Sequence, residues 1–117
     1  ANHARRPETV EIPGAPIAIV EGILALYDEK LCAMAELRVY VDAPDETCLL
    51  RRIERDSAER GRTEQSVRAQ FRATVQPMAE RFVRPTKARA DLVLDGREPI
   101  AEAAKRVLAR IPEPYRQ

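Results

Sequence analysis

The stretch that decides the fold is Pro16-Ile17-Ala18-Ile19-Val20-Glu21-Gly22, a short apolar run that stops at an acid and a glycine. Its side chains are mostly β-branched and follow one another without a polar interruption, which is typical of a strand buried on both faces of a parallel sheet. Residues 17–20 therefore predict an interior strand. Glu21 would then stand at the carboxyl end of that strand, where ligands bind in open α/β sheets.

On either side of this run, strand-like and helix-like patterns alternate along the chain. Further strands are predicted over 37–41 and 91–94, with a short alternating one over 8–12. Helical patterns cover four stretches. The first is 23–35, and the second runs from Pro44 to a stop at Gly61. The third begins near Thr63 as its N-cap and has Val67, Phe71, Val75 and Met78 on one face, and the fourth is 98–110. Pro77 is expected to kink or interrupt the third helix. The alternation predicts an α/β fold with a parallel sheet flanked by helices, in a single domain over 1–117.

Composition narrows the class of protein. With 44% hydrophobic and 33% charged residues, the chain is too apolar to be disordered, and no apolar run is long enough to span a bilayer. Its two cysteines, Cys32 and Cys48, fit neither a disulfide framework nor a metal-ligand spacing, which indicates a reduced, cytoplasmic protein. A single histidine, His3, nearly excludes a zinc site of the usual type.

Charge is distributed unevenly along the chain. Residues 51–89 hold eleven Lys or Arg and five acids, a balance of +6, whereas the remainder has a balance of −5. A basic middle in an otherwise acidic protein predicts a local anionic ligand, either phosphate groups of a small molecule or nucleic acid.

The arginines of this basic middle surround one acid. Arg52, Asp56 and Arg60 are spaced i, i+4, i+8 on one helix face, so that Asp56 can hold the arginines in place, and Arg55 and Arg62 lie nearby. Guanidinium groups suit polyphosphate oxygens and stabilise charge that develops during phosphoryl transfer. The other interpretation is a solvated helix surface with salt bridges of little consequence. The excess of positive charge favours a ligand.

Glu21 also has two interpretations. A carboxylate at a strand end can hold Mg²⁺ beside nucleotide phosphates, or it can be a helix N-cap or a solvated strand end. The four glycines, Gly14, Gly22, Gly61 and Gly96, do not form the Gly-x-x-x-x-Gly-Lys-Ser/Thr pattern of a phosphate loop. If the protein handles a nucleotide, the triphosphate cradle is not expected within this chain.

Several motifs together resemble the uridine kinase (uridine–cytidine kinase) family of P-loop nucleoside kinases. They are His3-Ala4-Arg5-Arg6-Pro7-Glu8-Thr9-Val10, Val20-Glu21-Gly22-Ile23-Leu24-Ala25-Leu26-Tyr27, Val41-Asp42, Arg51-Arg52-Ile53-Glu54-Arg55-Asp56-Ser57-Ala58-Glu59-Arg60-Gly61-Arg62, Pro85-Thr86-Lys87 and Ala90-Asp91. The resemblance runs from His3 to about Leu94. It implies phosphorylation of the 5′-hydroxyl of uridine or cytidine by ATP or GTP, with Mg²⁺.

The resemblance also implies roles for individual residues. Glu21 matches the magnesium-site glutamate, and a lid over about 52–84 is expected to close over the substrates. Arg60 and Arg62 are expected to act in catalysis, with Arg55 and Arg60 on the phosphates. The positions that match nucleoside contacts are His3, Arg52, Arg62 and Gln70. The family further implies a homo-oligomer in the cytoplasm, with no membrane or nucleic-acid partner.

The chain departs from the family pattern in three places. The phosphate loop and the general base of the family precede the part matched here, so the chain is expected to be a carboxyl-terminal portion that is inactive alone and needs the amino-terminal half. Residues 95–99 do not reproduce the family's loop near the adenine, and Arg89 replaces a common aromatic residue. Two other functions stay open: a kinase of the same fold with another small acceptor, similar to phosphoribulokinase, and a basic helical module that binds RNA or a protein.

Overall fold

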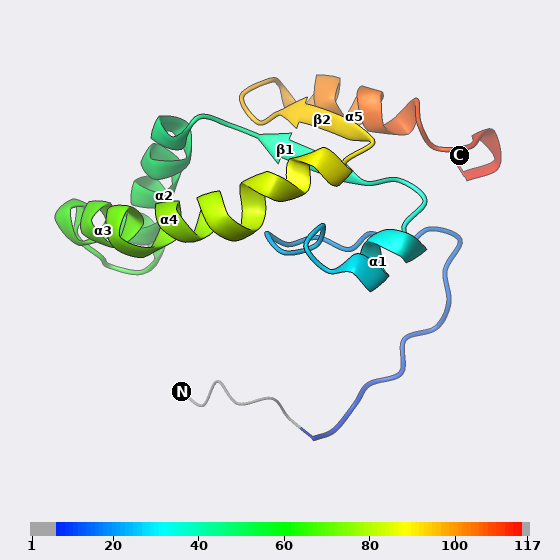
Figure 1. The fold of residues 1–117 in the computed structure, drawn as a ribbon, viewed down its shortest axis with the longest axis horizontal. Coiled ribbons are helices and arrows are strands. Elements are labelled where there is room, and N and C mark those ends of the chain that lie inside the picture. Colours follow the sequence, from blue (N-terminus) through cyan, green and yellow to red (C-terminus); the bar gives the residue numbers. More distant parts are fainter. Residues whose placement is uncertain (1–6, 116–117) are drawn as a thin grey trace.

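The computed structural model describes residues 7–115, in which two parallel strands are accompanied by helices (Figure 1). The strands β1 (Val39–Asp42) and β2 (Leu92–Asp95) pair in the register Val39↔Leu92 to Asp42↔Asp95. Both strands therefore end at the same edge, each with an aspartate. The predicted α/β class and the parallel pairing are confirmed.

Between the strands the chain is almost entirely helical. Helix α2 (Asp45–Glu59) follows β1 directly, and α3 (Glu64–Gln70) begins after a turn at Gly61. The run then continues through the π-helical turn Phe71–Val75, α4 (Gln76–Met78), the π-helical turn Ala79–Val83 and the 3₁₀ turn Arg84–Arg89. The remaining helices are α1 (Glu29–Met34), α5 (Ile100–Leu108) and the 3₁₀ turn Glu113–Tyr115.

Local sequence signals account for these boundaries. The Thr63 side chain accepts a hydrogen bond from the Ser66 N–H at 3.1 Å and caps α3, as predicted. Gly61 adopts a φ of +64°, the left-handed conformation in which helices commonly end. Pro77 does not end the helical run. Instead, π-helical turns flank it on both sides, which is one way a helix absorbs an inserted proline.

The hydrophobic core is small and lies mainly under α3. Among the described residues, the buried hydrophobic side chains are Val67, Phe71 and Leu94. Val67 and Phe71 confirm the predicted apolar face, whereas Met78, which was expected on the same face, is half exposed. The chain exposes 9767 Å², compared with roughly 6,400 Å² for a compact protein of this mass. Much apolar surface therefore stays in contact with solvent.

The predicted strands over 17–20 and 8–12 are wrong. Both segments are extended but form no strand, and Ile19 and Val20 are 88% and 62% exposed. An apolar run becomes a strand only where a neighbour takes up its backbone N–H and C=O groups, and these segments have no such neighbour in the part of the chain described. The predicted helix over 23–35 is also shorter, with turns over 23–27 before α1.

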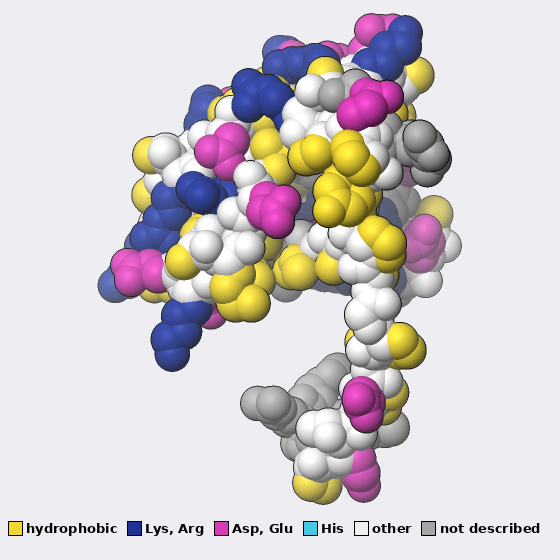
Figure 2. Space-filling model, turned by 90° about the vertical axis from the view of Figure 1, so that its right-hand side faces the viewer, with side chains coloured by type: hydrophobic (Ala, Val, Ile, Leu, Met, Phe, Trp, Pro, Cys, Tyr) yellow, Lys and Arg dark blue, Asp and Glu magenta, His cyan; other side chains and the backbone are white. Residues whose placement is uncertain are grey.

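Several of the exposed apolar side chains fall in one short segment of the chain. Ile17, Ile19, Val20, Ile23 and Leu24 are all at least 42% exposed. Figure 2 shows hydrophobic side chains at the surface both on the body of the molecule and along the extended amino-terminal segment. One edge of β1 is also free, because its partner in the described sheet is β2 alone. Within residues 7–115, none of the helices has the length and apolar character needed to cross a membrane.

Candidate functional site

The predicted arginines converge on one buried carboxylate. Asp56 lies on α2 with a side chain that is 1% exposed. Its Oδ1 accepts a hydrogen bond from Arg55 Nε at 2.9 Å and lies 3.6 Å from a terminal nitrogen of Arg60. Its Oδ2 lies 3.7 Å from a terminal nitrogen of Arg62. The predicted clustering of these arginines around Asp56 is therefore present.

The electrostatics of the cluster favour an anion. The hydrogen bond from Arg55 lowers the pKa of the Asp56 carboxyl most; burial opposes this, and the charges of Arg55, Arg60 and Arg52 lower the pKa further. The carboxylate is thus ionised at neutral pH. Four arginines against one buried carboxylate leave a local excess of positive charge. Arg55 and Arg60 keep 42% and 59% of their side chains exposed, so their remaining donors are accessible to a ligand.

Arg62 connects this cluster to α3. Its guanidinium donates a hydrogen bond to Gln70 Oε1 and another to Ser66 Oγ at 2.7 Å. Two residues that were predicted to contact a nucleoside, Arg62 and Gln70, are therefore in direct contact. The turn at Gly61 makes this possible, because it brings the chain back onto the end of α2.

The other predicted site residues are not part of the cluster. Glu21 is exposed in the loop after 17–20, and no hydrogen bond, ion pair or cavity described for residues 7–115 joins it to the arginines. His3 lies outside the described residues. The described residues contain no group of three His, Cys, Asp or Glu side chains that could hold a metal ion by themselves.

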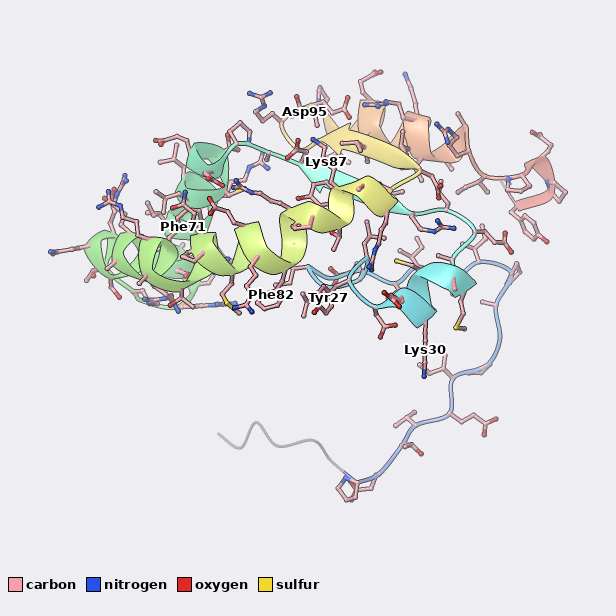
Figure 3. All side chains as sticks on the ribbon, viewed as in Figure 1. Tyr27, Lys30, Phe71, Phe82, Lys87 and Asp95 are labelled. Carbon is pink, nitrogen blue, oxygen red and sulfur yellow. The ribbon has the colours of Figure 1, made fainter. Side chains whose placement is uncertain are left out.

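A cleft of about 560 Å³ opens at the carboxyl ends of β1 and β2. Asp42 and Asp95 stand there at the ends of the strands, and Lys87 Nζ lies 2.8 Å from Asp42 Oδ2. Figure 3 shows Lys87 and Asp95 at this end of the sheet. Gly96 packs against β1 at this point: its N–H donates to the Asp42 carbonyl at 2.7 Å, and a Cβ would lie 3.1 Å from Val41.

Ion pairing balances the charges of this cleft. The hydrogen bond that Lys87 donates to Asp42 raises the pKa of Lys87, and the hydrogen bonds that Arg97 donates to Asp95 lower the pKa of Asp95. Arg84 forms an ion pair with Asp45. Each of these cations has a carboxylate of its own, unlike the arginines around Asp56. This cleft was not predicted from the sequence, although an aspartate at the end of each strand was the signal that pointed to it.

Arg89, which departs from the family pattern, has a defined structural role. Its guanidinium donates hydrogen bonds of 2.8 Å to the carbonyls of Leu26 and Tyr27. Tyr27 in turn packs edge-on against Phe82, with ring centroids 5.8 Å apart (Figure 3). These contacts attach the turn before α1 to the end of the helical run.

Comparisons with known proteins identify the relatives of this chain. The model of the phosphoribulokinase / uridine kinase family matches residues 1–100. A uridine kinase of Haemophilus influenzae is 47% identical over 92 residues, covering 79% of this chain and 43% of that protein. Uridine kinases of Borrelia turicatae and Lactobacillus helveticus are 43% and 44% identical, covering 80% and 79% of this chain.

The chain spans less than half of these relatives, between 43% and 45% of their length. The match nevertheless covers both strands, α2 and the arginine cluster, which lie within residues 1–100. The chain therefore belongs to the phosphoribulokinase / uridine kinase family.

Proposed function

We propose that this chain is part of an ATP- or GTP-dependent kinase that phosphorylates the 5′-hydroxyl of uridine or cytidine. The observation that carries the proposal is the excess of guanidinium groups around the single buried carboxylate of Asp56. Such a cluster suits the phosphates of a nucleotide, since fixed positive charge stabilises the charge that develops as a phosphoryl group moves. The uridine kinase relatives support the same acceptor.

Within this proposal each residue of the cluster has its own task. Arg55 and Arg60, which are largely exposed, contact the phosphates, and Arg60 with Arg62 stabilises the developing charge. Arg62 and Gln70, which are joined by a hydrogen bond, contact the nucleoside together with Arg52 and His3. Segment 52–84 forms a lid that closes over the substrates and excludes water.

Glu21 fits the magnesium ion that such a reaction uses. Mg²⁺ takes one or two carboxylates from the protein and completes its shell with phosphate oxygens and water, so a cluster of three protein ligands is not required. Glu21 is exposed and has no ion-pair partner among residues 7–115 that would compete for its carboxylate. When bound, the ion would neutralise phosphate charge, and Glu21 would hold it.

In this proposal the complete kinase contains a further region of polypeptide that packs against this chain. The chain lacks a phosphate loop and spans 43–45% of its relatives. It also exposes apolar side chains at 17–24, and one edge of β1 is free in the described sheet. We assign this surface to the part of the kinase that corresponds to the unmatched half of the relatives. Assembly into homo-oligomers belongs to the same proposal. The free thiols of Cys32 and Cys48 agree with a location in the reducing cytoplasm.

A chimeric enzyme tests this function. The segment of the Haemophilus influenzae uridine kinase that matches this chain is replaced by residues 1–117, and ATP-dependent phosphorylation of uridine is measured. We expect turnover by the chimera and none by the isolated chain. An inactive but folded chimera contradicts the proposed function. Turnover by the isolated chain contradicts the need for a second region and leaves the kinase function standing.

Arginine variants of the chimera test the role of the cluster. Arg62→Ala should lower turnover by on the order of 10³-fold, as expected for an arginine that stabilises a phosphoryl-transfer transition state. Arg72→Ala is the matched control, because Arg72 lies in the π-helical turn that follows α3, is exposed and has no ion pair in the described chain. It should stay within a few-fold of the parent. Equal rates for both variants would remove Arg62 from the mechanism.

A further inference from the structure

Asp56 is bound to its surroundings through both its side chain and its backbone. Its carboxylate meets the guanidinium groups of Arg55, Arg60 and Arg62 at 2.9, 3.6 and 3.7 Å. Its carbonyl oxygen accepts the N–H groups of Arg60 and Arg62 at 3.1 and 3.0 Å. A single residue therefore holds both the backbone and the side chains of the corner between α2 and α3.

The arginine side chains can stay close together only because the negative charge of Asp56 lies between them. Guanidinium groups a few ångströms apart repel one another, and their repulsion is strongest where water is excluded. The buried carboxylate offers each of its two oxygens to the surrounding donors and compensates part of the repulsion. Without the carboxylate, Arg55 and Arg60 gain more by turning outward into solvent. The guanidinium of Arg62 would keep its contacts with Ser66 and Gln70 alone.

We propose that Asp56 is a positioning residue, which preorganises Arg55, Arg60 and Arg62 as a receptor for a polyphosphate without contacting the ligand itself. The inference rests on the proposed function, because it specifies how the same cluster binds phosphate. Its prediction is the opposite of what the net charge of the site alone would suggest. Removing the carboxylate makes the site more positive, yet it should weaken the binding of a polyanion.

The test uses the 117-residue chain and inorganic tripolyphosphate, with affinity measured by calorimetry at a fixed ionic strength. Asp56→Asn removes the charge and keeps the size of the side chain. Glu54→Gln is the matched control, because Glu54 lies on the same helix, is exposed and has no ion pair in the described part of the chain. Asp56→Glu restores a carboxylate at the same position.

We expect Glu54→Gln to bind within twofold of the parent, Asp56→Asn to bind at least tenfold more weakly, and Asp56→Glu to lie between them. Circular dichroism of each variant verifies that the helices are retained. If Asp56→Asn binds as tightly as Glu54→Gln or more tightly, total charge governs the affinity and the inference is overturned.

A measurement without ligand separates this inference from the proposed function. Hydrogen exchange of the Arg55 Nε–H, followed by NMR, should be slowed in the parent and accelerated in Asp56→Asn. Unchanged exchange overturns the inference. If exchange depends on Asp56 but the parent does not bind tripolyphosphate, the positioning role stands and the phosphate-binding function fails. If Asp56→Asn does not fold, the inference is tested by comparing Asp56→Glu with the parent. Identical exchange of the Arg55 Nε–H and identical affinity for tripolyphosphate in these two proteins would overturn the positioning role of the Asp56 carboxylate.

Discussion

The turn at Gly61 offers the cleanest physical test of this structure. Gly61 has a φ of +64°, and a Cβ built at this position would meet no atom within 4 Å. Replacing it by alanine therefore adds no steric clash with the rest of the protein. The whole cost is the backbone strain of an L-residue in the left-handed region, about 1–2 kcal/mol.

Urea unfolding followed by circular dichroism measures this cost. With a slope of about 2 kcal/mol per molar urea, Gly61→Ala should lower the midpoint by roughly 0.5–1 M and leave the slope unchanged. Gly14→Ala is the control. Its Cβ would also meet nothing within 4 Å, but its φ is not positive, so we expect a change within about 0.5 kcal/mol.

The same substitution should also disturb the arginine cluster. The left-handed turn carries the Arg62 N–H back to the Asp56 carbonyl, and an alanine that shifts the turn would lengthen this hydrogen bond. Identical midpoints for Gly61→Ala and Gly14→Ala would refute the reasoning, because they would show that residue 61 is free to leave the left-handed region without loss.

Two further predictions concern stability. Val67→Ala removes two methyl groups from a fully buried side chain and should cost about 2–3 kcal/mol, whereas Val10→Ala, at a side chain that is 87% exposed, should change the free energy of unfolding by less than about 0.5 kcal/mol. Equal losses of unfolding free energy in the two variants, measured in urea, would contradict the role of Val67 in the core. The second prediction concerns stability in acid. The pKa of the Asp56 carboxyl is lower in the folded state than in the unfolded state. The stabilisation by Asp56 is therefore complete above the unfolded-state pKa of about 3.9 and is lost as the pH falls through the lower folded-state pKa. Unfolding measured from pH 7 to pH 2 should show a shallower acid dependence in Asp56→Asn, with the remainder due to groups such as Asp95. An unaltered acid profile would contradict this linkage.

The helices around the site were predictable because their signals are local. Pro44 and Gly61 bracket α2, and Thr63 caps α3 through a hydrogen bond that spans three residues. The ion pair of Arg60 with Asp56 follows from their spacing of four residues. A helix satisfies its backbone within each turn, so a short window of sequence contains most of the information that determines it.

The candidate site itself required the tertiary structure in several respects. Spacing placed Arg52 and Arg60 near Asp56, but it did not show that the carboxylate is almost fully buried or that Arg62 returns to it. The hydrogen bond between Arg62 and Gln70 joins the turn after α2 to the last residue of α3. The cleft at the strand ends combines residues about fifty positions apart, such as Asp42 and Asp95.

The apolar run at 17–20 shows where local sequence reasoning ends. Hydrophobicity and β-branching describe a segment that is suited to a sheet, but a strand exists only when another segment supplies its hydrogen-bond partners. Val39–Asp42 has such a partner in Leu92–Asp95, and residues 17–20 have none within the described chain. The amino-acid sequence alone indicated most of the helices, the family and the arginines that surround Asp56. The tertiary structure decided which strands pair and which carboxylate those arginines share, because both depend on contacts between distant parts of the chain.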